Sequence, residues 1–103
     1  MTDLKVRVDK KKLERTAYVL KCVAHPVRIS IIDLLEQEKQ LTVSKLQEVL
    51  QIEQSLLSHH LTNMRDKGIV ETRRQGKHVF YSLTDASISN IIDCIKGCKP
   101  VRQ

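Results

Sequence analysis

Aromatic side chains are scarce in this chain of 103 residues, which contains one Phe, two Tyr and no Trp. Proteins that hold single-stranded nucleic acids stack bases on aromatic side chains, so the scarcity counts against that mode of binding. The core must be built mainly from Leu, Ile and Val. A hydrophobic fraction of 41% still fits a globular protein. At this length we expect one domain over residues 1–103, with residues 1–8 as a flexible arm.

Long apolar runs are also missing. The N-terminus has no apolar core of signal-peptide length, and no run approaches the roughly 20 residues of a membrane span. Three cysteines are an odd number, which does not favour a disulfide framework. We therefore expect a cytoplasmic protein with reduced thiols and no membrane partner.

Catalytic motifs are absent from the sequence. Ser, His and Asp occur, but they are not accompanied by a glycine-rich phosphate loop, a nucleophile elbow or an HExxH motif. We do not expect an enzyme. Acidic residues are also few, twelve against eighteen Lys and Arg, which gives a net charge of +6. Such a surface favours a polyanionic partner, although it can also serve solubility alone.

Two helices are predicted in the first part of the chain. The first begins after Asp9, a suitable N-cap, and places Leu13, Ala17 and Leu20 at helical spacing. Because this helix is apolar on more than one side, we expect it to contact both the core and a second subunit. His25-Pro26 separates it from the second helix, since proline suits a first helical turn.

A helix-turn-helix is predicted next. Thr42 caps a short third helix, and the break at residues 51–53 has the length of the turn in such a motif. The fourth helix covers residues 54–67 and stops at Gly68. The apolar residues of the third helix are expected to face inward: Val43, Leu46, Val49 and Leu50.

Alternating apolar residues predict two strands, 69–74 and 78–83, around a turn at Gln75-Gly76. A last helix opens at Asp85 and ends at Lys99-Pro100. Its isoleucines form a stripe too apolar for a small monomer to cover, which indicates a homodimer interface together with the first helix. The residues assigned to this interface are Leu13, Ile88, Ile91, Ile92 and Ile95.

The fourth helix has an apolar side and a polar side, which can form hydrogen bonds with base edges and phosphates in a major groove. The polar side comprises Gln54, Ser55, Ser58, His59, Thr62 and Arg65. His60 lies beside the apolar side, where a packing or hydrogen-bonding role is expected. An ordinary solvated face would have the same composition.

Basic residues surround the turn between the two predicted strands, where they suit phosphates or a minor groove. They are Arg73, Arg74, Lys77 and His78. Basic residues also protect exposed strand edges, which is the simpler alternative. Together with the polar helix, however, they favour a mainly α winged helix-turn-helix with a two-stranded wing, bound as a dimer to double-stranded DNA. A winged-helix protein-interaction module is the alternative from another functional class.

Four segments resemble the ArsR/SmtB-type repressors: Leu20–Ile29, Gln54–Leu61, Arg65–Val70 and Arg74–Leu83. The first is similar to the second-helix signature of these proteins, and the others to their recognition helix, its exit and the wing. The resemblance extends from about Leu13 to Ile95. It implies a homodimeric transcriptional repressor on a palindromic operator, joined through the first and last helices and released by an inducer.

The known inducer sites of that family do not match this sequence. Residues 41–46 lack the Cys-x-Cys of the metal-thiolate site on the third helix. Asp85 is followed by Ser87 where the zinc site of the last helix has His, and Cys98 and Val101 replace its later His residues. Asp33 stands where the persulfide-sensing branch has a cysteine.

Three cysteines remain as candidates: Cys22, Cys94 and Cys98. Cys94 and Cys98 are one helical turn apart and could share a soft metal or metalloid ion, or respond to an oxidant, with Cys22 or a partner cysteine as third ligand. Alternatively, all three are small buried hydrophobic residues and the repressor has no cysteine-based sensing.

Overall fold

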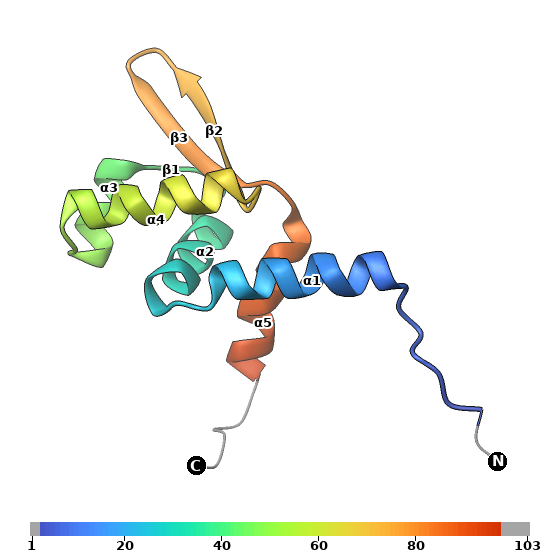
Figure 1. Cartoon of the computed structure of the whole chain (residues 1–103). Coiled ribbons are helices and arrows are strands. Elements are labelled where there is room, and N and C mark those ends of the chain that lie inside the picture. The colour runs from blue at the N-terminus through green and yellow to red at the C-terminus, as the bar shows by residue number, and fades with distance from the viewer. Residues whose placement is uncertain (1–2, 98–103) are drawn as a thin grey trace.

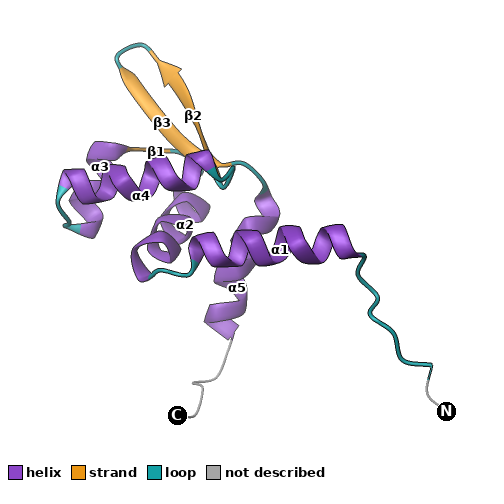
Figure 2. Ribbon diagram, in the orientation of Figure 1, coloured by secondary structure: helices purple, strands orange, loops and turns teal. Residues whose placement is uncertain are grey.

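The computed structural model describes residues 3–97, which form helices packed around a core with one hairpin projecting from them (Figures 1 and 2). Residues 3–9 precede the first helix without regular secondary structure. The elements are, in chain order, α1 (Lys10–Val23), α2 (Pro26–Glu38), β1 (Leu41–Thr42), α3 (Val43–Leu50), α4 (Gln54–Asp66), β2 (Val70–Gln75), β3 (His78–Leu83), the 3-10 helix η1 (Ala86–Ser89) and α5 (Asn90–Gly97). Within residues 3–97, no helix is long and apolar enough to cross a membrane.

The first two helices begin where the sequence predicted, and each has a side-chain cap. The Asp9 side chain accepts a hydrogen bond from Lys12 N at 2.9 Å, and α1 begins at the next residue. His25 caps α2, because its Nδ1 accepts from Val27 N at 3.1 Å while Pro26 occupies the first turn. These caps satisfy N–H groups that a helix leaves unpaired at its start, and they confirm both predicted starts.

The helix-turn-helix consists of α3, a three-residue turn and α4. Gln51 lies in the left-handed region at φ 53° and ψ 47°, and its N–H donates to Gln47 O at 2.8 Å. The Gln47 side chain donates to Ile52 O at 3.4 Å across the same turn. This sharp reversal lets α4 begin within three residues of the end of α3.

The predicted two-stranded wing is present as β2 and β3, and the short strand β1 extends it to a three-stranded antiparallel sheet in the order β1-β3-β2. Leu41 pairs with Tyr81 and Thr42 with Phe80, which joins the base of the wing to the segment between α2 and α3. A strand of two residues is too short to show alternation in a sequence. The turn lies at Gly76-Lys77, one residue later than predicted, with Gly76 at φ 62°.

Aliphatic residues dominate the buried core, as the shortage of aromatics required. Among the described residues, the largest fully buried side chains are those of Ile31, Ile32, Leu35, Leu46, Leu57, Leu61, Met64, Ile69 and Val70. The prediction that Val49 faces inward was wrong, because this residue is 49% exposed on α3. Leu50 and Val43 are partly buried against the core.

The predicted last helix is divided into η1 and α5. Asp85 caps η1 by accepting from Ser87 N at 2.9 Å. Hydrogen bonds from Ser87 lower the pKa of the Asp85 carboxyl, and the positive charge of Arg15 lowers it further. The predicted end at Lys99-Pro100 lies outside the described residues.

Candidate nucleic-acid interface

The two sides of α4 are separated as its sequence predicted. All six residues of the polar side are exposed: Gln54, Ser55, Ser58, His59, Thr62 and Arg65. The other side is buried against the core through Leu57, His60, Leu61 and Met64. Because the helix repeats every 3.6 residues, burying these four holds the polar side chains outward. That leaves a row of hydrogen-bonding groups accessible along α4.

An acidic residue at the start of α4 alters the role expected for Ser55. The Ser55 hydroxyl donates to Glu53 Oε1 at 2.7 Å, and Glu53 makes no side-chain cap bond to the helix. A carboxylate there opposes the attraction of the helix N-terminus for phosphate. Sequence reasoning did not consider Glu53. Ser58, His59 and Thr62 are exposed farther along the same side of the helix.

His60 occupies the packing and hydrogen-bonding position that its place on the helix predicted. It is 4% exposed, and its Nδ1 accepts a hydrogen bond from Arg28 Nε at 3.0 Å. The His25 ring lies 4.5 Å away between centroids. Burial lowers the pKa of His60 below the ordinary value, and the neighbouring His25, Arg28 and His59 charges lower it further. The neutral imidazole is therefore favoured, which suits the hydrogen bond that Nδ1 accepts from Arg28.

Arg28 ties α4 to the junction between α1 and α2. Besides the bond to His60, its Nη1 donates to Cys22 O at 2.8 Å and to Asn63 Oδ1 at 2.9 Å. One guanidinium therefore joins the end of α1 to two residues of α4 that lie about one helical turn apart. No local pattern indicates this role, because His60 and Asn63 lie 32 and 35 residues from Arg28.

The wing carries its basic residues at an exposed tip. Register pairs Arg73 with Phe80, Arg74 with Val79 and Gln75 with His78. Since consecutive residues of a strand point to opposite faces, Arg73 and Arg74 lie on different faces of the hairpin. Lys77 lies in the turn itself. The four predicted basic residues, all exposed, therefore surround the tip rather than form one flat patch.

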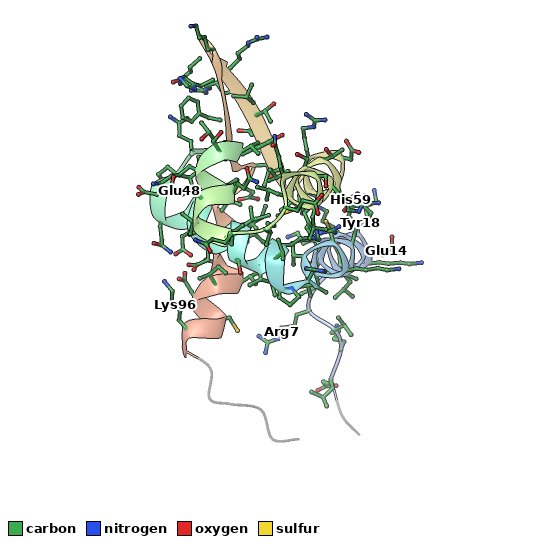
Figure 3. The ribbon with its side chains drawn as sticks, turned by 90° about the vertical axis from the view of Figure 1, so that its left-hand side faces the viewer. Arg7, Glu14, Tyr18, Glu48, His59 and Lys96 are labelled. Atoms are coloured by element: carbon green, nitrogen blue, oxygen red, sulfur yellow. The ribbon has the colours of Figure 1, made fainter. Side chains whose placement is uncertain are left out.

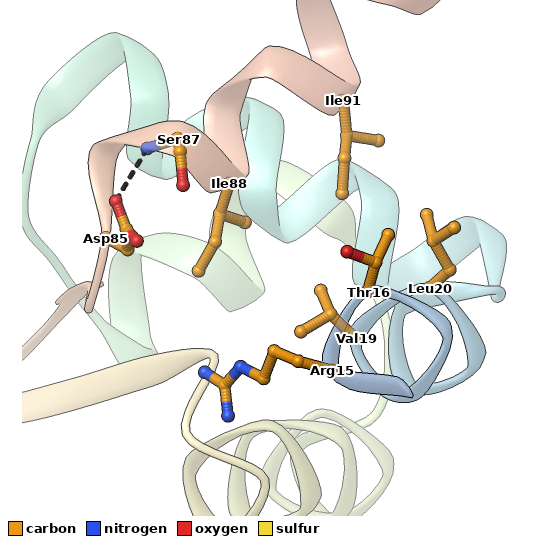
Figure 4. A pocket seen from close by; sticks show the side chains of 8 residues that line it. All are labelled: Arg15, Thr16, Val19, Leu20, Asp85, Ser87, Ile88 and Ile91. Atoms are coloured by element: carbon orange, nitrogen blue, oxygen red, sulfur yellow. Dashed lines mark hydrogen bonds between the residues drawn. The ribbon is translucent and has the colours of Figure 1, made fainter. Parts of the chain in front are cut away.

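A shallow pocket of about 280 Å³ lies between α1 and the η1–α5 segment, where the dimer interface was predicted (Figure 4). Val19, Leu20, Ile88 and Ile91 supply its apolar lining. Leu20 is 50% exposed, and the predicted contact residue Leu13 is 45% exposed. Both therefore present apolar surface outside the core of one chain.

The isoleucine stripe is less exposed than the sequence predicted. Ile88 and Ile92 are 8% and 4% exposed, because they pack into the chain's own core. The expectation that a monomer could not cover them was wrong for these two. Ile91 is half-buried and lines the pocket. The side chain of Ile95 is not among those described.

A model of bacterial regulatory proteins of the arsR family matches residues 25–72, from the start of α2 into β2. The transcriptional repressor PagR of Bacillus anthracis is 35% identical over 86 residues, which cover 84% of this chain and 86% of PagR. The chain belongs to the arsR family. Another family member, the biofilm growth-associated repressor of Xylella fastidiosa, is 36% identical over 85 residues, covering 82% of this chain and 74% of that protein.

Solved structures of arsR-family regulators share this architecture. The crystal structure of PagR superposes with a TM-score of 0.78 at 34% identity, covering 84% of this chain and 99% of PagR. HlyU from Vibrio cholerae gives a TM-score of 0.77 at 30% identity, covering 88% of this chain and all of the HlyU chain. The winged helix-turn-helix predicted from the sequence is confirmed.

The cysteines of this arsR-family chain lie in different surroundings. Cys22 is buried at the end of α1, and its Sγ donates to Asn63 Oδ1 at 3.7 Å. Cys94 is exposed on α5, and Cys98 lies outside the described residues. Across residues 3–97, no three His, Cys, Asp or Glu side chains gather as metal ligands would. The predicted site at Cys94 and Cys98 stays a prediction.

Proposed function

We propose that this arsR-family chain is a sequence-specific DNA-binding transcriptional repressor, acting as a homodimer on a palindromic operator in the cytoplasm. The observation that carries the proposal is the exposed polar side of α4 beside a projecting hairpin with an exposed basic tip. An α-helix is about 10–12 Å across with its side chains, and a B-DNA major groove is about 12 Å wide.

Two kinds of contact follow from this geometry. Ser58, His59 and Thr62 are short enough to reach base edges without holding α4 away from the groove floor. The wing residues Arg73, Arg74 and Lys77 neutralise backbone phosphates or enter the adjacent minor groove. The helix would then select the sequence while the wing supplies affinity for any duplex.

Repression is the direction of control that the named relatives favour. PagR and the biofilm growth-associated protein are both named repressors. HlyU of Vibrio cholerae, 32% identical over 85 residues, is named a transcriptional activator. A reporter gene behind the selected operator tests the direction, because expression should rise when this chain is removed.

Competition binding with operator and random duplexes tests the assignment of the DNA contacts. Ser58→Ala should cost about 1–3 kcal/mol of discrimination while keeping affinity for random DNA. Arg74→Ala should weaken both duplexes alike and reduce the salt dependence by about one phosphate contact. If the parent protein bound operator and random duplexes equally and without dependence on salt, the result would instead support a protein-interaction module.

Ile91→Glu tests the proposed homodimer. The substitution places a charge in the α1–α5 pocket and should give monomers with weaker operator binding, because two half-sites are no longer held together. Val49→Glu is a matched control, since Val49 is an exposed apolar residue on α3. An Ile91→Glu variant that sediments as a dimer would place the interface elsewhere.

Thiol-dependent release is tested separately. Cys94→Ser/Cys98→Ser should still bind the operator but no longer release it when As(III), Cd(II) or a mild oxidant is added. If the parent protein stays bound under every such treatment, these cysteines have no role in sensing.

A further inference from the structure

A cationic hollow of about 290 Å³ lies between α1 and α4, apart from the polar side of α4 and from the wing. The hollow is lined by Tyr18, Lys21 and Cys22 of α1, Arg28 of α2, Asn63 of α4, and Lys67 just after α4. Three of these six side chains are cations, and no acidic residue lines the hollow within the described part of the chain.

Two of the three cations, Arg28 and Lys67, are held in place without being neutralised. Arg28 is fixed by its bonds to Cys22 O, His60 and Asn63, and Lys67 Nζ lies 5.2 Å from the centroid of the Tyr18 ring. Within residues 3–97, the salt bridge joins Lys45 to Glu48 and includes none of the three cations of the hollow. Asn63 Oδ1 accepts from both Arg28 and Cys22, which leaves its NH2 group as a donor.

This arrangement fits an oxyanion. Like charges around one hollow repel each other, and a bound phosphate group would replace that repulsion with charge-assisted hydrogen bonds. The hollow is also large enough for a phosphate group, because its volume of about 290 Å³ is several times the roughly 30 Å³ that one water molecule occupies in the liquid. Lysine and arginine are the residues that proteins use most for phosphate contacts.

We propose that Lys21, Arg28 and Lys67 bind a backbone phosphate of the operator on the α1 side of the recognition helix. The inference rests on the proposed function. A helix that fills a major groove has a phosphate backbone along each flank. Figure 3 shows Tyr18 of α1 and His59 of α4 toward the same side of the molecule. Asn63, which lines the hollow, lies about one helical turn from His59.

The test is a Lys21→Gln/Lys67→Gln variant, compared with the parent for operator binding over a series of salt concentrations. Arg28 is left intact because it also holds the fold together. Loss of one phosphate contact should make the slope of log affinity against log salt less negative by about 0.9. Between about 50 and 200 mM salt, the variant should lose about 3.5-fold less affinity than the parent. Operator and random duplexes should be weakened alike at low salt.

Lys10→Gln/Lys96→Gln is the matched control, since it removes the same charge from exposed positions at the start of α1 and on α5. Figure 3 shows Lys96 across the molecule from Tyr18 and His59. This control should keep the parental salt slope. The inference is overturned if Lys21→Gln/Lys67→Gln keeps that slope, or if the control changes it equally.

A second measurement separates the phosphate of DNA from a free anion. Inorganic phosphate added to DNA-free protein should shift the side-chain NMR signals of Asn63 in the parent and not in the Lys21→Gln/Lys67→Gln variant. If those shifts are lost while the salt slope is unchanged, the hollow binds a free oxyanion and the operator assignment is wrong. Parent protein that fails to select an operator would instead refute the proposed function itself.

Discussion

Arg28→Ala is the most informative single substitution for the link between α1 and the recognition helix. It removes donors from three acceptors at once, His60 Nδ1, Cys22 O and Asn63 Oδ1, at 2.8 to 3.0 Å. Two of those residues, His60 and Cys22, are buried at 4% and 7% exposure, so water cannot readily replace the guanidinium there. The substitution would therefore weaken the link between the end of α1 and α4.

The cost can be estimated from those three bonds. Hydrogen bonds that involve a charged group contribute about 1.5–3 kcal/mol each, and a buried acceptor left unpaired costs about 1–3 kcal/mol. Asn63 is only half-buried and can be hydrated, and the three contributions are not additive. We therefore expect Arg28→Ala to lower the free energy of unfolding by roughly 3–4 kcal/mol. Arg28→Lys keeps the charge but lacks the planar fork, so it should lose about half as much.

Urea denaturation at one fixed protein concentration measures these differences, because self-association would make stability depend on concentration. Arg74→Ala on the exposed wing is the control for loss of an arginine and should change stability by less than about 0.5 kcal/mol. Hydrogen exchange should also become faster in α4 of Arg28→Ala. If Arg28→Ala is as stable as Arg74→Ala, the network does not hold α4.

Four further substitutions test other parts of the fold. His60→Asn keeps an acceptor near the position of Nδ1 but cannot titrate. Because the pKa of His60 is lowered, the parent should lose stability as the pH falls below 6.5, and urea denaturation should show a smaller loss in the variant. Gln51→Gly should raise the free energy of unfolding by about 0.5–1 kcal/mol, since glycine adopts the left-handed conformation of that turn without strain, whereas Glu48→Gly inside α3 should lower it by about 1 kcal/mol. Leu61→Ala should cost about 2–5 kcal/mol, because this side chain is fully buried; a loss below about 1 kcal/mol would mean that the α4 contact is not part of a packed core.

Elements with strong local signals were predictable. Asp9, His25-Pro26 and Thr42 mark helix starts through interactions within three residues, so their effect is visible in sequence. The sidedness of α4 was also predictable, since its periodicity extends over several turns. By contrast, β1 is two residues long and is defined only by pairing with Tyr81 and Phe80, about 40 residues away. No local pattern could have revealed it.

The candidate site likewise has parts that the sequence predicted and parts that only the structure shows. The exposed residues of α4 and the wing tip follow from periodicity and charge, because each side chain keeps the direction that its own helix or strand imposes. The hydrogen bond from the Ser55 hydroxyl to Glu53 was not predicted, because only the coordinates show which neighbour the hydroxyl contacts. The prediction that Ile88 and Ile92 need a partner subunit to cover them was wrong, because an apolar stripe has the same sequence pattern whether the core of its own chain or a partner covers it.

By itself, the sequence determined the winged helix-turn-helix, its recognition helix and the basic character of its wing, because spacing and residue type act over a few neighbouring residues. Only the tertiary structure decided that Arg28 binds Cys22, His60 and Asn63, and that Lys21 and Lys67 share a hollow with it. These residues are distant in the chain, and how α1, α2 and α4 pack together determines which of their side chains meet.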